Sequence, residues 1–236
     1  MKSWNLLLPQ GVLTIQSREQ GAGTVLLVAG GRRPAAAWLL AAAQARTVYC
    51  ADKGIECCLD NGLLPAILCG DADSAAPAAW QQAQAAGVKI LRHDPAKDDT
   101  DLQLLLAALP ARVNVIASGI WGGRFDHLYS NVFSLLAHKR RQGTQVVLAD
   151  EQELLVLLQG GESVVFEPSV PEAIEALSLL PLTDCSEVTL QGVQWNLAYS
   201  PLLLAHPYAV SNMVRLPRVD CTCHQGSIGF YVKYKV

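Results

Sequence analysis

A chain of 236 residues, 51% of them hydrophobic, can form one large domain or two modest ones with substantial cores. Its formal net charge of −3 provides no basic surface, so we expect no nucleic-acid partner. No apolar run approaches the roughly 18 residues of a membrane span, and the first residues do not read as a signal peptide. With seven cysteines, an odd number, we expect reduced, buried thiols, a cytoplasmic location and no membrane association.

Strand-like and helix-like segments alternate along the first part of the chain. Strands are expected at residues 24–29, 47–51, 66–69, 88–91, 113–117 and 145–149, and helices at residues 34–44, 54–60, 77–86, 99–109 and 124–142. Regular alternation of this kind predicts a doubly wound parallel α/β sheet.

The pattern changes near Asp150. Gly160-Gly161 stands between apolar runs at residues 154–158 and 163–166, which predicts a β-hairpin. Further strand candidates lie at residues 174–179, 187–190, 213–216 and 228–234. Short strands at this spacing are typical of a β-sandwich. We therefore expect an α/β domain at residues 1–150 and a β-sandwich domain at residues 151–236.

Two aspartates, Asp71 and Asp73, follow the expected strand at residues 66–69. Carboxylates at the C-terminal end of a parallel strand lie where open α/β sheets bind ligands. Mg²⁺ prefers a few carboxylates together with waters and phosphate oxygens. The alternative is an ordinary turn, since Gly, Asp and Ser are common turn residues. This segment alone favours the turn.

A second acidic segment, Asp98-Asp99-Thr100-Asp101, lies at the start of an expected helix. Thr100 with Gln103 fits a capping box, and acids in a first helical turn suit the helix dipole. Capping explains one or two of these acids. It does not require three of them.

A glycine-rich segment from Gly119 to Gly123 lies between an expected strand and an expected helix. Backbone N–H groups in such a place can bind an anion, and Arg124 adds a bidentate phosphate donor. The simpler alternative is a plain loop with His127 at the surface. The helix itself shows a core stripe at Phe125, Leu128, Val132 and Leu136.

These segments together favour phosphate chemistry more than any one of them does. Carboxylates follow several expected strands at one edge of the sheet, namely Asp52, Asp71, Asp73, Asp98 and Asp101. Clustered carboxylates repel one another, so they need a cation or raised pKa values. A Mg²⁺-bound polyphosphate supplies that cation, and the glycine loop with Arg124 supplies anion contacts. The combination predicts phosphoryl or pyrophosphoryl transfer.

Four segments, residues 51–54, 70–74, 97–101 and 119–127, resemble in order and spacing the motifs of the thiamine pyrophosphokinase family. The similarity continues at residues 192–197 and at Ser211-Asn212. It implies an α/β domain with a β-sandwich, acting as a homodimer with active sites at the dimer interface. It also implies Mg²⁺-dependent transfer of the pyrophosphoryl group of ATP to the hydroxyethyl group of thiamine, with release of AMP.

The resemblance assigns roles on the ATP side. It implies that Asp71, Asp73 and Asp101 bind Mg²⁺, with Asp52 and Asp98 nearby. The positions implied for ATP and its phosphates are Asp52, Thr100, Gly122, Gly123 and Arg124. One departure is Lys53, which stands where the family usually has glycine and could strain the turn or add a phosphate contact.

On the thiamine side, the resemblance implies contacts from Asp126, Trp195, Ser211 and Asn212. An aromatic such as Trp195 could stack on the aminopyrimidine ring. The residues around Ser211-Asn212 depart from the family pattern, since Ala209-Val210 precedes them and Met213 follows where an acid is usual. Both Asp126 and Asp98 remain candidates for the general base.

Two other functional classes stay open: a non-catalytic thiamine or nucleotide sensor, and a metal-dependent phosphohydrolase. The intact acidic set with Arg124 argues against the sensor. Cys221-x-Cys223-His224 resembles part of a zinc site, but zinc ligands normally come with a second cluster. We find none in the sequence and expect no zinc.

Overall fold

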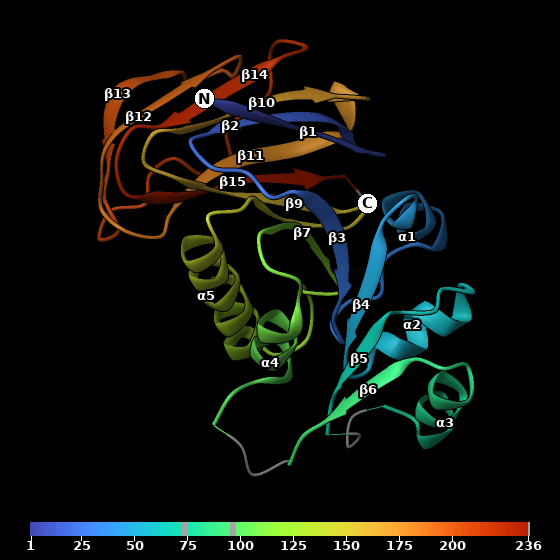
Figure 1. Cartoon of the computed structure of the whole chain (residues 1–236). Coiled ribbons are helices and arrows are strands. Elements are labelled where there is room, and N and C mark those ends of the chain that lie inside the picture. The colour runs from blue at the N-terminus through green and yellow to red at the C-terminus, as the bar shows by residue number, and fades with distance from the viewer. Residues whose placement is uncertain (72–74, 95–97, 236) are drawn as a thin grey trace. The chain divides into compact units, whose positions relative to one another are not determined.

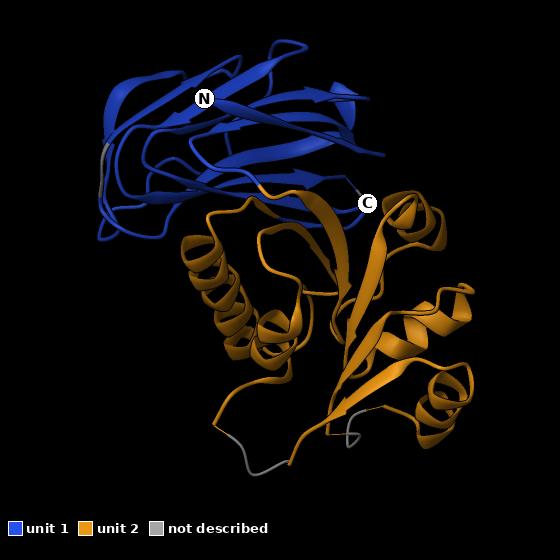
Figure 2. Cartoon of the chain, viewed as in Figure 1, with its two compact units in different colours: residues 1–20, 147–236 blue, residues 21–146 orange. Residues whose placement is uncertain are grey.

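The computed structural model describes residues 1–71, 75–94 and 98–235 (Figure 1). It divides the chain into two compact units, coloured separately in Figure 2. Unit 2 is Gly21–Val146, and unit 1 combines Met1–Gln20 with Val147–Val236. The expected α/β domain of residues 1–150 is therefore wrong at its beginning, because the first 20 residues belong with the C-terminal strands.

The strands of unit 2 form the expected parallel sheet. They are β3 (Gly23–Val28), β4 (Thr47–Ala51), β5 (Ile67–Gly70), β6 (Lys89–Arg92) and β7 (Val113–Ser118), in the order β7-β3-β4-β5-β6. Neighbouring strands are parallel throughout. Central strands that are buried on both faces read as continuous apolar runs, which is why the sequence predicts them well.

The helices of unit 2 are α1 (Ala36–Ala43), α2 (Gly54–Asp60), α3 (Pro77–Ala85), α4 (Asp101–Ala108) and α5 (Phe125–Gln142). Figure 1 shows α4 and α5 on one face of the sheet and α2 and α3 on the other. The chain order changes direction between β3 and β7. Ligands of open α/β sheets bind at the C-terminal strand ends beside such a switch point.

Unit 1 contains two antiparallel sheets, as expected for a β-sandwich. One has the order β1-β2-β10-β14-β12-β13, and the other is formed by β11-β15-β9-β8, the antiparallel part of a nine-stranded sheet. Their bounds are β1 (Lys2–Leu8), β2 (Gly11–Ser17), β8 (Val146–Ala149), β9 (Glu153–Gln159), β10 (Glu162–Pro168), β11 (Ile174–Pro181), β12 (Cys185–Gln191), β13 (Leu197–Leu202), β14 (Val219–Cys223) and β15 (Ser227–Tyr234). A short 3₁₀ turn, η1 (Pro171–Ala173), precedes β11. The rings of Phe166 and Phe230 meet edge to face between the sheets, with centroids 6.3 Å apart.

Two expectations for the sandwich are wrong. β9 and β10 flank Gly160-Gly161 but pair in different sheets, so they form no hairpin. The Gly161 N–H instead donates to the Cys223 carbonyl at 2.7 Å. Residues 213–216 form no strand and contribute an isolated bridge at Val214.

The sequence analysis missed β1, β2, β13 and β14. The first two form a hairpin at the start of the chain, in which Trp4, Leu6 and Leu8 alternate with exposed residues. That alternation is the signal of a half-buried strand. Among the described residues, no helix is long and apolar enough to cross a membrane.

Candidate functional site

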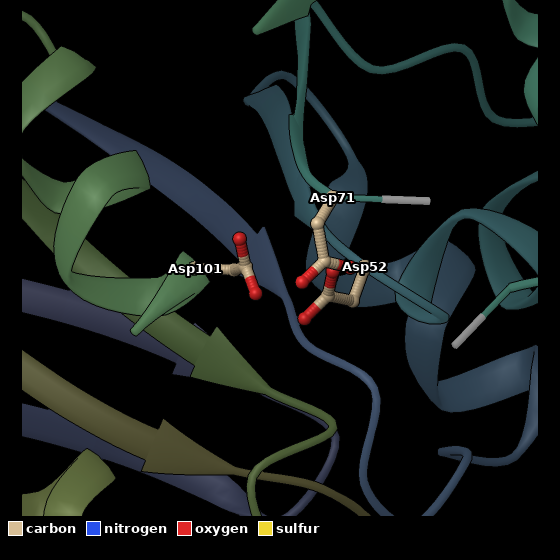
Figure 3. Close-up of side chains that lie close together, drawn as sticks. All are labelled: Asp52, Asp71 and Asp101. Carbon is tan, nitrogen blue, oxygen red and sulfur yellow. The ribbon is translucent and has the colours of Figure 1, made fainter. Parts of the chain in front are cut away.

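Three carboxylates converge at the C-terminal ends of neighbouring strands in unit 2. Asp52 follows β4, Asp71 follows β5, and Asp101 begins α4 (Figure 3). One ligand oxygen from each lies within 4.8 Å of the other two, and all three residues are partly buried. The structure thus brings Asp71 and Asp101 together and adds Asp52. We call this group the carboxylate triad.

The backbone places Asp52 in an unusual conformation. Its φ of 47° lies in the left-handed region, which Asp tolerates better than most residues. The Asp52 N–H donates to the Cys69 carbonyl at 2.9 Å, which ties this turn to the end of β5. A Cβ on Gly70 would lie only 2.3 Å from Asp52 Oδ1. Glycine at position 70 is therefore what leaves room for the carboxylate.

The triad has the chemistry and spacing of a divalent-cation site. Mg²⁺ binds oxygens at about 2.0–2.1 Å in an octahedron, so two ligands on opposite sides are about 4.2 Å apart. Oxygens that all lie within 4.8 Å of one another can meet this requirement with small side-chain rotations. Three adjacent carboxylates also repel unless a cation lies between them. The residues present therefore fit Mg²⁺.

A capping box fixes the position of Asp101. Thr100 Oγ1 accepts from the Gln103 N–H at 3.3 Å, and Gln103 Oε1 accepts from the Thr100 N–H at 2.8 Å. This reciprocal pair starts α4 and holds its first turn, where Asp101 lies. The hydroxyl of Thr100 thus acts as a helix cap in this structure.

The loops after β3 and β7 are pressed together at the switch point. The Gly31 N–H donates to the Gly119 carbonyl at 2.7 Å. A Cβ on Gly119 would lie 2.2 Å from the Ala29 carbonyl, and Gly119 has a φ of 68°. Gly122 and Gly123 follow with φ of 78° and 72°, both exposed. Only glycine allows this backbone packing and this sequence of turns.

Arg124 and Asp126 form a two-pronged ion pair at the start of α5. Arg124 Nε donates to Asp126 Oδ1 at 3.1 Å, and Nη2 donates to Oδ2 at 2.5 Å. Asp126 Oδ1 also accepts from the His127 N–H at 3.0 Å. The Arg124 hydrogen bond holds the pKa of Asp126 below its usual range. Both side chains are exposed, and the pair uses Nε and Nη2, so Nη1 of the guanidinium can be offered to a ligand.

In unit 1, the side chain of Asn212 holds the backbone of Trp195. Asn212 Oδ1 accepts from the Trp195 N–H at 3.1 Å, and Nδ2 donates to the Trp195 carbonyl at 2.8 Å. Asn212 is only 7% exposed, whereas Trp195 is 56% exposed. The buried amide therefore fixes a turn that presents an indole to solvent.

Ser211 lies beside this turn in a left-handed conformation, with a φ of 57°. Its N–H donates to Ser178 Oγ at 3.0 Å, and the backbone of Asn212 pairs with Leu177 in both directions. These bonds attach the turn to β11. The predicted trio of Trp195, Ser211 and Asn212 is therefore one local structure.

Comparison with protein-family models assigns both halves of the chain. Residues 39–148 match the model described as thiamin pyrophosphokinase, catalytic domain. Residues 168–227 match thiamin pyrophosphokinase, vitamin B1 binding domain. The chain belongs to the thiamine pyrophosphokinase family.

Sequence relatives and solved structures of this family agree with the assignment. A thiamine pyrophosphokinase of Bacillus subtilis (strain 168) is 29% identical over 193 residues, covering 80% of this chain and 88% of that protein. Thiamine pyrophosphokinase 3 of Oryza sativa subsp. japonica is 28% identical over 162 residues, covering 64% and 59%.

Two solved structures show the same fold. The Bacillus subtilis thiamine pyrophosphokinase structure superposes with a TM-score of 0.76 at 23% identity, covering 90% of this chain and 100% of that one. The Candida albicans thiamin pyrophosphokinase structure gives 0.75 at 14% identity, covering 90% and 89%.

The sites expected from the thiamine pyrophosphokinase resemblance divide between the two matched regions. The carboxylate triad and Arg124 lie in the catalytic match, and the Trp195 turn lies in the vitamin B1 binding match. Asp73 lies outside the described residues. Asp98 is exposed and does not join the described metal-type cluster.

Phe125 is a correction to the sequence analysis. It was expected in the core stripe of α5 but is 77% exposed. Its ring lies 6.2 Å from that of Tyr129, which in turn lies 4.7 Å from that of Phe133, so aromatic rings follow one helix face out to solvent. Helical period alone cannot show that the first turns of α5 are exposed.

The segment Cys221-x-Cys223-His224 is split between two environments. Cys221 and Cys223 are fully buried on the inner face of β14. His224 Nε2 lies 2.9 Å from Thr189 Oγ1, and its ring stacks on Tyr199 with centroids 4.7 Å apart. The two thiols and the imidazole therefore belong to the core and to a surface cluster, respectively.

Proposed function

We propose that this family member transfers the pyrophosphoryl group of ATP to the hydroxyethyl group of thiamine, giving thiamine diphosphate and AMP. The observation that carries the proposal is the carboxylate triad within the region that matches the catalytic domain. The match of residues 168–227 to a vitamin B1 binding domain supports thiamine as the acceptor.

The transfer balances without a covalent enzyme intermediate. The thiamine hydroxyl oxygen bonds to the β-phosphorus, and the bond from that phosphorus to the α,β-bridging oxygen breaks. The electron pair stays on the bridging oxygen, which leaves as part of AMP, and the hydroxyl proton passes to a base or to water. The protein's task in such reactions is positioning and charge stabilisation.

We propose Mg²⁺ as the cofactor, held by Asp52, Asp71 and Asp101, with Asp73 kept from the sequence analysis as a further ligand. When bound there, the ion neutralises phosphate charge. Through that ion, the carboxylates would hold the polyphosphate at the C-terminal ends of β4 and β5. Thr100, Gly122 and Gly123 remain proposed phosphate contacts, and Thr100 would act through its backbone or through a hydroxyl shared with the helix cap.

Arg124 supplies the strongest proposed contact with the reacting phosphates, because a guanidinium fork matches phosphate oxygens in geometry and charge. Asp126 holds that fork in a defined orientation. Its lowered pKa makes Asp126 a weak proton acceptor, and Asp126 and Asp98 both remain candidates for the general base. Asp126 then serves the substrate site as an orienting carboxylate and as a counter-charge for the thiazolium ring.

Trp195 is the proposed stacking surface for the aminopyrimidine ring of thiamine. Its exposure leaves the indole available, and Asn212 fixes its backbone. The amide of Asn212 is already used by this turn, so its role is to position Trp195. Ser211 holds the same turn and remains a proposed contact.

We also propose a homodimer with active sites at its interface. Large exposed apolar side chains are concentrated in one stretch of unit 1, which is typical of interaction surfaces. They are Trp195, Tyr199, Leu203, Leu204, Tyr208, Val210, Met213 and Leu216. The thiols of Cys50, Cys57, Cys58, Cys69, Cys221 and Cys223 are free and buried, which supports the proposed cytoplasmic location.

Mixing two inactive variants tests whether each site draws on two subunits. Asp71→Asn removes a triad charge and Trp195→Ala removes the indole. A heterodimer of the two should regain one wild-type site in a C₂ dimer. If subunit exchange is confirmed and the mixture is no more active than its parents, the shared-site dimer is wrong.

A coupled assay for AMP tests the activity itself, with thiamine, thiamine monophosphate or no acceptor added to ATP and Mg²⁺. We expect AMP to form only with an acceptor and thiamine diphosphate to form in equal amount. Phosphate release without acceptor would instead indicate the phosphohydrolase. Binding of both ligands with no turnover would indicate the sensor.

A further inference from the structure

A pocket of about 190 Å³ shares the Asp52–Gly54 turn with the carboxylate triad. Its walls come from the loop after β3 and from the start of α2. The lining residues are Ala29, Gly30, Gly31, Arg33, Lys53, Gly54 and Cys57. None of the residues that line it belongs to the triad, and only Lys53 was considered in the sequence analysis, where a strained turn and a phosphate contact were the alternatives.

Bare backbone forms much of this pocket, because glycine is required at two of its positions. A Cβ on Gly54 would lie 2.4 Å from the Val28 carbonyl, and one on Gly31 would lie 2.5 Å from the Trp121 carbonyl. Gly30 packs against Lys53: a Cβ added to Gly30 would lie 3.1 Å from the Cβ of Lys53. Glycine-lined walls let a ligand approach the main chain closely.

Two cations line the pocket, and among the described residues only one of them forms an ion pair. Arg33 pairs with Glu56 at 2.6 Å and with Asp60 at 2.8 Å. Lys53 is exposed, and its ammonium group makes no hydrogen bond or ion pair with any described residue, although its backbone carbonyl accepts from the Glu56 N–H at 3.2 Å. It lies in an ordinary right-handed conformation, with φ −58° and ψ −15°, so it does not strain the turn. The ammonium group is thus the available positive charge of this pocket.

We propose that this pocket is the subsite for the nucleoside 5′-monophosphate part of ATP, with Lys53 binding its α-phosphate. The proposal rests on the function proposed above, since it assigns the part of ATP that leaves as AMP. A lysine is a point-charge phosphate binder. Ligand pockets are typically about 300–1,000 Å³, so this one holds part of a nucleotide.

The placement separates two electrostatic tasks within adjacent residues. Asp52 belongs to the carboxylate triad. The triad attracts a cation, and it repels a phosphate group when no cation is bound. Lys53, the next residue, carries a positive charge of its own and so attracts the α-phosphate directly, without the cation of the triad. When the β-phosphorus is transferred, negative charge develops on the oxygen left with the α-phosphate. A lysine at that phosphate stabilises the leaving group and retains AMP after transfer.

Binding of AMP alone tests the subsite, because AMP can be measured with chelator present and without turnover. Titration calorimetry compares wild type with Lys53→Ala, Lys53→Arg and the control Lys89→Ala. Lys89 is an exposed lysine at the start of β6. We expect Lys53→Ala to weaken AMP binding about tenfold or more, since a hydrogen bond to a charged group contributes about 1.5–3 kcal/mol. Lys53→Arg should retain most of the affinity, and Lys89→Ala all of it.

Adenosine is the control ligand for this titration, because it has the nucleoside of AMP but lacks the phosphate. Its affinity should be the same in wild type and Lys53→Ala, and thermal melting should show that both are folded. In turnover, Lys53→Ala should raise KM for ATP and leave KM for thiamine unchanged.

Three results would overturn the subsite: no AMP binding by wild type at millimolar concentration, equal AMP affinity in Lys53→Ala, or an equal loss for adenosine. Failure of the proposed function looks different. If the proposed function is wrong, no AMP forms when thiamine is added. AMP binding that depends on Lys53 can still be observed in that case.

Discussion

Replacing Gly70 with alanine should disable the proposed Mg²⁺ site without changing any of its ligand residues. The added Cβ would lie 2.3 Å from Asp52 Oδ1, whereas side-chain carbons essentially never come closer than 3.0 Å to another heavy atom. The carboxylate of Asp52 or the end of β5 must therefore move by about 0.7 Å, the gap between those two distances. Metal sites tolerate deviations of only about 0.2 Å in ligand distance.

The magnitude follows from that displacement. Mutating groups that orient a metal ligand typically costs about 10–100-fold in metal affinity, and overpacking a tight site costs about 1–3 kcal/mol of stability. We expect Gly70→Ala to raise the Mg²⁺ concentration for half-maximal AMP formation by at least about tenfold. Mn²⁺ binding, measured by calorimetry without substrates, should weaken in parallel.

Two controls separate this effect from a general loss of fold. Gly23→Ala adds the same methyl group at the start of β3, where no atom lies within 4 Å of the new Cβ, and should leave Mg²⁺ dependence unchanged. In an Asp52→Ala background, the clashing oxygen is gone, so Gly70→Ala should cost little stability. Wild-type Mg²⁺ and Mn²⁺ affinities in Gly70→Ala, or an equal stability loss in both backgrounds, would refute the reasoning.

Three further predictions concern a phosphate contact, a positioning residue and a buried histidine. Arg124→Lys keeps the charge but loses the planar fork, so kcat should fall steeply with little change in KM for thiamine; a change confined to that KM would exclude the phosphate role. Asn212→Ala should raise KM for thiamine about tenfold and leave AMP affinity intact, because the Trp195 turn loses its hydrogen bonds; unchanged thiamine-dependent quenching of tryptophan fluorescence would contradict this. Burial lowers the pKa of His138 from 6.5 to about 4. The unfolded chain therefore takes up the proton at a higher pH than the folded chain does. The free energy of unfolding should decline as the pH falls from 6.5 towards 4, by up to about 3 kcal/mol. Chemical denaturation should show a weaker pH dependence in His138→Leu, and equal dependence in both proteins would remove His138 as the cause.

The parallel sheet of unit 2 could be predicted from sequence because burial on both faces leaves a direct signature. The strand at Thr24–Val28 is almost wholly apolar and ends in two glycines. In the sandwich, the signal is ambiguous. Gly160-Gly161 correctly marks a turn, but a turn does not determine whether the two strands pair or cross between sheets. That choice depends on distant partners, β2 for β10 and β15 for β9.

In the candidate site, too, some features could be predicted from the sequence and others could not. Positions after expected strands placed Asp71 and Asp101 at one edge of the sheet with other carboxylates, and the family resemblance implied that these two bind Mg²⁺. The resemblance placed Asp52 beside the metal and among the ATP positions, but not among the metal ligands, because the direction of its side chain depends on a positive φ and on the absence of a side chain at Gly70. Neither condition is visible in a residue's type alone. Asn212 was expected to contact the ligand, but its amide is bonded to the Trp195 backbone.

The turn at Asp52-Lys53-Gly54 shows how one short segment can serve two opposite charges. The left-handed conformation of Asp52 turns its carboxylate towards Asp71 and Asp101. The backbone returns to a right-handed conformation at Lys53, where α2 starts. Gly54 then packs directly on the end of β3, where any side chain would meet the Val28 carbonyl. If Lys53 were instead a second left-handed residue, the helix could not begin there and the ammonium would leave the pocket. The conformation of the turn, more than the identity of its charges, therefore keeps cation and anion sites apart.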